Sequence, residues 1–225
     1  MKNLLRKNQE KSIRKLKTKH PKQQTLNDKL KTLNSNSNIW DFIVLPPGED
    51  INEWIALNTF NFFTNIQTFY EMMFEICTQE TCPHMCIGDN ECRWKNKDKT
   101  LESLPAMKYI DNCLNYCQEQ LDNPKIFPNE LGVSFSEKFL TIVKLMFKRM
   151  FRVYGHFYFH HFDKLTELDV EKHLNSSFKR FICFAAEFDL IDLKEVKVLE
   201  NVLNNIMPDL MKRFETNDKK KKSKK

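Results

Sequence analysis

Residues 134–163 read SFSEKFLTIVKLMFKRMFRVYGHFYFHHFD, and the rest of the chain is interpreted outward from this stretch. It predicts one long helix, because Ser134 and Glu137 have the spacing of a capping box at a helix N-terminus. The helix carries a run of cations in its middle and a group of three histidines at its end. These two features indicate where the function lies.

The cations of this helix share one face. Lys144, Lys148 and Arg152 recur every four residues, and Arg149 lies beside them. From residue 139 to residue 162 the helix contains no Asp or Glu, so none of these charges has an acidic partner within it. The run therefore predicts an unpaired cationic patch. The alternative interpretation is a solvated face that happens to be basic.

The flanking sequence predicts further helices. The first begins after Asp50, because Asp50 and Glu53 again have capping-box spacing. Apolar residues then occupy more than one face as far as residue 76, which predicts that this helix lies at the centre of a bundle. Strand signals are weak throughout, so the fold class is all-α, a helical bundle. The other predicted helices span residues 107–122, 175–188 and 192–207.

Composition narrows the class of protein. The chain has 225 residues, 41% hydrophobic, including 19 Phe, which is enough for a sizeable core. Its four glycines are scattered, so neither a P-loop nor a dinucleotide-binding glycine motif can be written anywhere. This argues against a nucleotide-dependent enzyme.

The charge is unevenly distributed along the chain. Residues 1–24 contain nine Lys or Arg and one acid, and residues 217–225 contain six Lys and one acid. Because these tails together carry a net charge of +13 and the whole chain +6, the body is close to −7. We predict a flexible basic arm over residues 1–38, a folded domain over 39–212 and a Lys-rich disordered tail over 213–225. The acidic body argues against nucleic acid as the partner.

No apolar run reaches the length of a membrane span, and the first residues contain no hydrophobic leader segment. We therefore expect a cytoplasmic protein that can also be nuclear. Seven cysteines in a reducing compartment do not predict a disulfide framework. They raise the question of metal binding instead.

Residues 77–104 form an irregular, cysteine-bearing segment whose length requires an anchor. Cys77 and Cys82 stand there as Cys-x4-Cys, while His156 and His161 stand as His-x4-His at the end of the long helix. Two thiolates and two imidazoles suit a tetrahedral structural zinc ion. Such a site would tie the segment to the helix.

Spacing alone leaves two alternatives open. Cys86 and Cys92 follow Cys82 closely, so a site of four cysteines competes with the mixed one. On an ideal helix, the side chain of His161 points about 140° away from that of His156, whereas His160 is only about 40° away. Helix geometry alone therefore favours His160 as the second imidazole.

Long, ordered motifs cover nearly all of residues 45–207 and resemble those of one family. They read LPPGEDINEWIALNTFNFF, EICTQETCP, MKYID, FPNELGVSF, KRMFRVYGHFYFHHFD and HLNSSFKRFICFAAEFDLID. Through these motifs the chain resembles the Mob/phocein family of kinase activators. The resemblance implies a non-catalytic α-helical adaptor with one structural zinc ion and no small-molecule substrate.

By position, the resemblance implies Cys77, Cys82, His156 and His161 as the zinc ligands. It implies His161 rather than His160, which requires the helix to end or distort after His156. The two later cysteines are not part of the family pattern. A zinc hydrolase is disfavoured, because four protein ligands leave no position for a catalytic water.

The resemblance also assigns a role to the cationic patch. In Mob proteins of the Hippo and mitotic-exit type, the run that matches Lys148, Arg149 and Arg152 binds phosphorylated segments of Ste20-like kinases. The chemistry agrees, because a phosphate brings close to two negative charges and accepts several charge-assisted hydrogen bonds.

A second surface in the family is acidic and binds the basic regulatory segment of NDR/LATS-type AGC kinases. Glu49, Asp50, Glu53 and Trp54 match that region, although Trp54 can equally be a buried core residue. Asn61 is a departure, because relatives have an acid at this position. Opposite charges would favour fast and selective docking.

The leading hypothesis is a non-catalytic activator that binds an NDR/LATS-type kinase and shifts it towards its active state. The alternative is a phocein-like scaffold in a phosphatase-kinase complex. The resemblance further implies a regulatory phosphorylation site in the arm ahead of the LPPGED motif, at Thr32 or the similarly placed Thr25.

Overall fold

The computed structural model describes residues 38–130, 132–207 and 209–223. The chain divides into two units, Met1–Phe42 and Ile43–Lys225. The described part of the first unit contains the short 3-10 helix η1 (Ile39–Phe42). All other described elements belong to the second unit, which is a helical bundle, as predicted. Thr32 and Thr25 lie outside the described residues.

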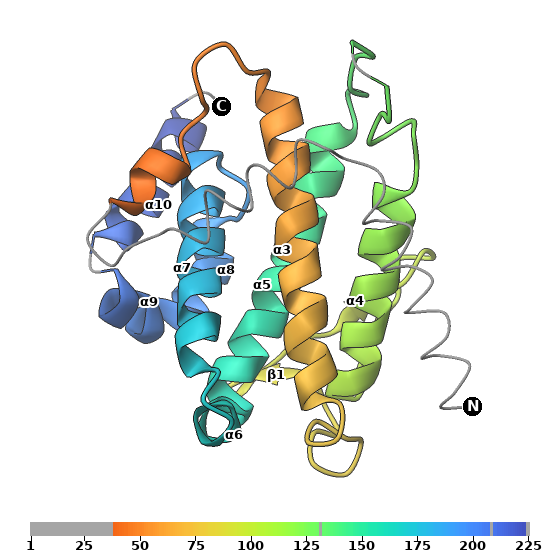
Figure 1. The fold of residues 1–225 in the computed structure, drawn as a ribbon. Helices are drawn as coiled ribbons and strands as arrows, with labels where there is room; N and C mark the ends of the chain where they lie inside the picture. Colours follow the sequence, from red (N-terminus) through yellow and green to blue (C-terminus); the bar gives the residue numbers. More distant parts are fainter. Residues whose placement is uncertain (1–37, 131, 208, 224–225) are drawn as a thin grey trace. The chain divides into compact units, whose positions relative to one another are not determined.

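Four long helices of the second unit lie side by side (Figure 1). Aromatic side chains fill the space between them. The rings of Phe62, Phe147 and Phe181 meet pairwise with centroids 5.0–5.8 Å apart, and all three are fully buried. Each such side chain contributes about 1.5–3 kcal/mol by leaving water. The helices are α3 (Ile51–Met73), α4 (Ala106–Leu121), α5 (Phe139–His160) and α7 (Glu171–Glu187).

Helix α3 begins where the sequence predicts. The Asp50 carboxylate accepts hydrogen bonds from the backbone N–H groups of Asn52 (2.8 Å) and Glu53 (3.0 Å), which satisfies two donors that the first turn leaves unpaired. Trp54 is buried, and its indole N–H donates to the carbonyl of Ile43 at 3.0 Å. Of the two roles left open for Trp54, the structure shows the core residue.

Helix α5 begins later than predicted, at Phe139. The prediction of a capping box at Ser134 was wrong, because Ser136 forms the turn before the helix instead. The Ser136 hydroxyl accepts from the N–H of Lys138 (3.2 Å), and the Ser136 carbonyl accepts from that of Phe139 (2.9 Å). At its other end α5 stops at His160, and α6 (Phe162–Glu167) follows after one residue.

The segment between α3 and α4 contains two small antiparallel hairpins among the described residues. Strands β1 (Cys86–Ile87) and β2 (Asn90–Glu91) form the first. Strands β3 (Trp94–Lys95) and β4 (Leu101–Glu102) form the second. Strands of two residues carry almost no periodic signal, which explains why the sequence did not predict them.

Gly155 allows the first hairpin to lie directly against α5. A Cβ atom at this position would be 2.9–3.0 Å from three side-chain carbons of Ile87, closer than packed atoms come. The hairpin therefore rests on the helix surface at a position without a side chain. This contact sets the distance between β1 and the end of α5.

The C-terminal region differs from the prediction in two ways. The expected helix over residues 192–207 is divided into α8 (Leu193–Val196), the 3-10 helix η2 (Lys197–Leu199) and α9 (Glu200–Ile206). The predicted disordered tail was wrong, because most of it belongs to α10 (Leu210–Lys222).

Helix α10 is packed against α7 rather than free. Leu210, Met211 and Phe214 are buried, and Arg213 pairs with Glu187 at 2.6 Å. The charge of the segment suggested disorder, but three apolar residues at helical spacing outweigh that signal. Within the described ranges, no helix combines the length and apolar character that crossing a bilayer requires.

Candidate metal centre and cationic surface

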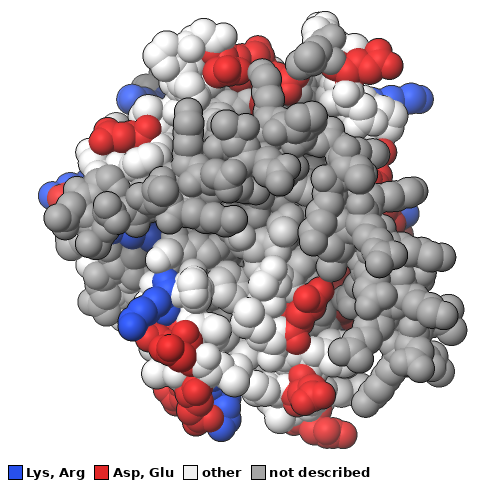
Figure 2. Space-filling model, viewed as in Figure 1, with Lys and Arg blue, Asp and Glu red and all other residues white. Residues whose placement is uncertain are grey.

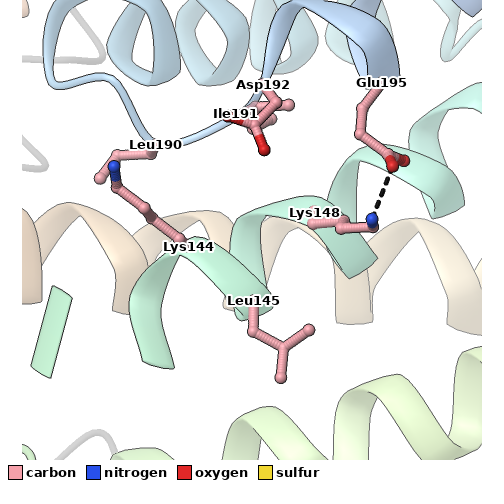
Figure 3. A pocket seen from close by; sticks show the side chains of 7 residues that line it. All are labelled: Lys144, Leu145, Lys148, Leu190, Ile191, Asp192 and Glu195. Atoms are coloured by element: carbon pink, nitrogen blue, oxygen red, sulfur yellow. Dashed lines mark ion pairs between the residues drawn. The ribbon is translucent and has the colours of Figure 1, made fainter. Parts of the chain in front are cut away.

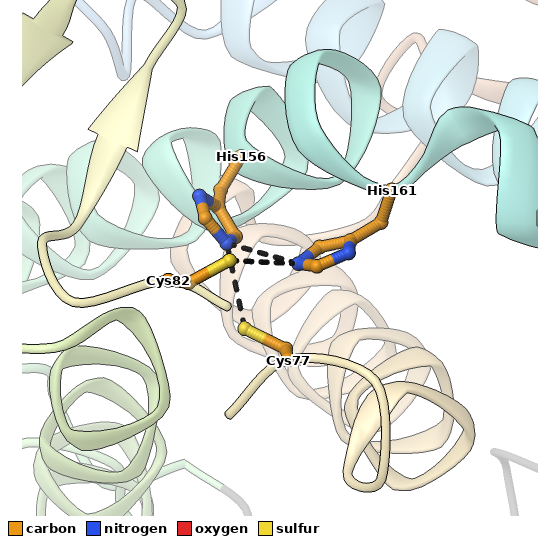
Figure 4. A group of neighbouring side chains, drawn as sticks. All are labelled: Cys77, Cys82, His156 and His161. Atoms are coloured by element: carbon orange, nitrogen blue, oxygen red, sulfur yellow. Dashed lines mark hydrogen bonds between the residues drawn. The ribbon is translucent and has the colours of Figure 1, made fainter. Parts of the chain in front are cut away.

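Four buried side chains converge at one end of α5: Cys77, Cys82, His156 and His161 (Figure 4). Their potential ligand atoms all lie within 4.8 Å of one another. The Nε2 atom of His156 is 3.5 Å from the Cys77 sulfur, and the Nε2 atom of His161 is 3.5 Å from the Cys82 sulfur. The two Nε2 atoms are 3.2 Å apart. Among the described residues, this is the only such group of three or more potential ligands.

Local structure explains how the two cysteines reach this point. Cys77 follows α3, and its N–H still donates to the Met73 carbonyl at 2.7 Å, so the helix sets its position. Cys82 closes a tight turn in which its N–H donates to the Thr78 carbonyl at 2.9 Å. The Thr81 hydroxyl braces the same turn by donating to the carbonyl of Ile76 at 2.8 Å.

The junction between α5 and α6 decides which histidine joins the group. His161 has φ −134° and ψ 5°, which is not helical, so its side chain leaves the direction that an ideal helix would give it. His160 is exposed and stacks on the outer side of His156, with ring centroids 4.8 Å apart. The structure thus brings His161, and not His160, to the two cysteines.

The spacing of these atoms fits a tetrahedral metal ion. With metal–sulfur bonds of about 2.3 Å and metal–nitrogen bonds of about 2.0 Å, a tetrahedral site places sulfur and nitrogen about 3.5 Å apart and two nitrogens about 3.3 Å apart. The observed separations are 3.5 Å for the Cys77–His156 and Cys82–His161 pairs, two of the four sulfur–nitrogen pairs, and 3.2 Å for the nitrogens. The cluster could therefore hold a metal ion, and its donor set is compatible with zinc.

The protonation of the two imidazoles also suits a metal. Burial lowers the pKa of both His156 and His161 to about 4, so both imidazoles are neutral at pH 7. The Nδ1 atom of His156 lies 2.9 Å from the Cys86 carbonyl, which fixes the proton there and leaves Nε2 free to bind. Cys86 thus contributes its backbone to this site, not its thiol.

The predicted cationic patch has an acidic partner that the sequence did not reveal. Glu195 of α8 contacts Lys148 (Nζ to Oε1, 2.5 Å) and Arg152 (Nη2 to Oε2, 3.2 Å), and Lys144 pairs with Asp189 at 3.2 Å. The patch is therefore not unpaired. We use the name cationic surface for Lys144, Lys148, Arg149 and Arg152 together.

Arg149 differs from the other members of the cationic surface because it is buried, with 8% of its surface exposed. Its guanidinium lies between the rings of Trp94, 3.9 Å from the centroid, and Tyr116, at 4.1 Å. Its Nη1 atom is buried and has no hydrogen-bond partner among the described residues.

A pocket of about 140 Å³ adjoins the cationic surface (Figure 3). Leu145, Leu190 and Ile191 supply its apolar lining, and charged side chains form the rest. In the figure, Lys148 points towards Glu195 across this space. The charged residues are Lys144, Lys148, Asp192 and Glu195.

The other sequence-predicted surface lies at the N-terminus of α3. Glu49, Asp50 and Glu53 are exposed there, while Trp54 is buried and is unavailable as a contact residue. Figure 2 shows several groups of acidic side chains and few basic ones on the described part of one face. The departure Asn61 is buried rather than part of the exposed surface.

The sequence missed residues that complete the cationic surface from other elements. Glu195 lies within the helix predicted over residues 192–207, and nothing in the sequence links it to the cations of the long helix. Trp94 and Tyr116 likewise carry no signal that links them to Arg149. These contacts join segments more than thirty residues apart in the chain, so no local pattern could have found them.

Residues 30–199 match the model of the Mob1/phocein family, and the chain belongs to this family. MOB kinase activator-like 1A of Arabidopsis thaliana is 41% identical over 175 residues, covering 76% of this chain and 81% of that one. MOB kinase activator-like 1 homolog A of Dictyostelium discoideum is 42% identical, covering 76% and 82%. Maintenance of ploidy protein mob1 of Schizosaccharomyces pombe is 39% identical, covering 78% and 85%.

Proposed function

We propose that the protein is a non-catalytic adaptor that binds and activates a protein kinase of the NDR/LATS type. The observation that carries this proposal is the extended similarity to relatives named kinase activators, over about three quarters of the chain. A buried cluster in which protein side chains supply all four potential ligands supports a structural role for the metal, because no position is left for a reacting water.

Zinc is the metal that we propose for this cluster. Two thiolates and two imidazoles at tetrahedral spacing are the donor set of structural zinc sites. The ion would join three segments: the loop after α3, the β1 strand through the Cys86 carbonyl, and the junction of α5 with α6. Its contribution would be to hold the hairpins against the bundle.

The cationic surface is the proposed binding site for a phosphothreonine segment of an upstream Ste20-like kinase. Arg149 contributes a buried positive charge beside this site rather than an exposed contact group. Lys148 and Arg152 stand close enough to share one carboxylate, so one phosphate could contact both.

The exposed acids at the start of α3, Glu49, Asp50 and Glu53, are the proposed contact for the basic regulatory segment of the kinase. Because their side chains are exposed, attraction between them and a basic segment would depend on salt. Changing Glu53→Lys should weaken docking of such a segment, measured as its association rate at low and high salt. An effect that is the same at both salt concentrations would contradict electrostatic docking.

A pull-down from native extract tests the two surfaces together. The bait is the full chain, compared with a variant carrying Lys148→Gln and Arg152→Gln and with Glu53→Lys. Arg149 is left unchanged because it is part of the core. We expect an AGC kinase to be lost only with Glu53→Lys and a phosphorylated Ste20-like kinase only with the double variant. Recovery of phosphatase subunits without an AGC kinase would favour the phocein-like scaffold.

A further inference from the structure

Glu195 occupies the place that a phosphate would need. Its two carboxylate oxygens are divided between Lys148 and Arg152, at 2.5 Å and 3.2 Å. Burial alone would raise the pKa of Glu195, but the hydrogen bonds and charges of Lys148 and Arg152 outweigh it and lower the pKa. The chain therefore already holds an anion on the cationic surface.

The cations do not depend on Glu195 alone for their positions. Arg152 also donates from Nη1 to the hydroxyl of Tyr109 at 3.2 Å, and this bond uses a different nitrogen. Arg149 is fixed by the rings of Trp94 and Tyr116. If the Glu195 carboxylate moved away, both guanidinium groups would keep a separate support.

The side chain of Glu195 can also move away from the cations. It belongs to α8, a helix of four residues that runs directly into η2, whereas the cations belong to the long helix α5. The pocket of about 140 Å³ is lined by both Lys148 and Glu195. Rotation of the glutamate side chain into this space would expose Lys148 and Arg152 without moving the bundle.

We propose that Glu195 is an internal competitor for the cationic surface. An external anion binds there only if it interacts with Lys148 and Arg152 more strongly than the Glu195 carboxylate does. The proposal rests on the proposed phosphothreonine binding at this surface. A carboxylate on a partner would only replace the carboxylate already present, so it would gain little. A phosphothreonine brings nearly two negative charges and three acceptor oxygens, so replacing the Glu195 carboxylate by this phosphate is favourable. The competitor thus admits a phosphorylated segment and excludes an acidic one.

The test is Glu195→Gln in the full, metal-loaded chain, which keeps the shape of the side chain and removes its charge. The probes are N-acetyl-phosphothreonine N-methylamide and N-acetylglutamate N-methylamide, titrated by NMR while the side-chain signal of Arg152 is followed. We expect the variant to bind the phosphothreonine probe about tenfold more tightly, about 1.4 kcal/mol. The glutamate probe should bind measurably only to the variant.

Asp192→Asn is the matched control, because Asp192 lines the same pocket but its described ion pair is with Lys221. This variant removes one nearby negative charge but leaves Glu195 on the cations. Its affinity for the phosphothreonine probe should therefore exceed that of the wild type by less than about threefold. A thermal melt of each variant confirms that the fold is intact.

The outcomes separate the two proposals. Phosphothreonine binding by the wild type with equal or weaker binding by Glu195→Gln would overturn the competitor and make Glu195 a positioning residue. Equal gains for Glu195→Gln and Asp192→Asn would also overturn it, because any lost acid would then suffice. If neither the wild type nor Glu195→Gln binds the phosphothreonine probe, the proposed phosphate site fails, and the competitor fails with it.

Discussion

Arg149 should stabilise the fold whether or not a phosphate is bound. Arg149→Met keeps an unbranched side chain of similar length but removes the charge that lies between Trp94 and Tyr116. Two desolvated cation–π contacts contribute about 2 kcal/mol each. Removing the buried Nη1 donor, which has no hydrogen-bond partner among the described residues, offsets this by about 2 kcal/mol. The net loss in the free energy of unfolding is therefore about 2 kcal/mol.

Urea unfolding with the metal present measures this loss. With a slope of about 2 kcal/mol per molar urea, the midpoint should fall by about 1 M. Lys148→Met is the control, because it removes a positive charge from the same helix but only a partly exposed ion pair, which contributes at most about 1 kcal/mol. If both variants shifted the midpoint equally, or if Arg149→Met left it unchanged, the aromatic contacts would not stabilise the fold.

Three further perturbations test other parts of the structure. Elemental analysis should find about one zinc ion per chain, and Cys82→Ser should lose it together with cooperative unfolding; full stability without metal would refute the structural role. Gly155→Ala should lower the unfolding free energy by about 1–3 kcal/mol through its clash with Ile87, and adding Ile87→Ala should restore part of this; a neutral single variant would show that the hairpin can move. Phe214→Ala should cost about 3–5 kcal/mol in a calorimetric melt, whereas a disordered tail would predict no change.

The sequence predicted those parts of the fold that depend on neighbouring residues. The start of α3 is an example, because the Asp50 carboxylate and the N–H groups that it accepts from lie within three residues. The start of α5 was predicted wrongly for a related reason. Two serines stood close together, and spacing alone could not show that Ser136 rather than Ser134 builds the turn.

The four candidate metal ligands were predictable, but the contacts around the cationic surface were not. The family pattern implied all four candidate ligands, His161 included, whereas ideal helix geometry alone favoured His160 because it does not contain the break at His161. The pairing of Glu195 with Lys148 and the burial of Arg149 depend on how α8 and the hairpins pack against α5. Such contacts arise from the tertiary structure and produce no periodic pattern in the sequence.

Helix α10 has a practical consequence for anyone who prepares this protein. The family match ends at residue 199, so a fragment designed from that match alone would stop before α10. The cut would remove Phe214 and its buried neighbours and expose the apolar surface of α7 beneath them. Exposed apolar surface of this kind promotes aggregation. A fragment intended for binding or crystallisation studies should therefore continue to at least residue 223, and an affinity tag should follow that point.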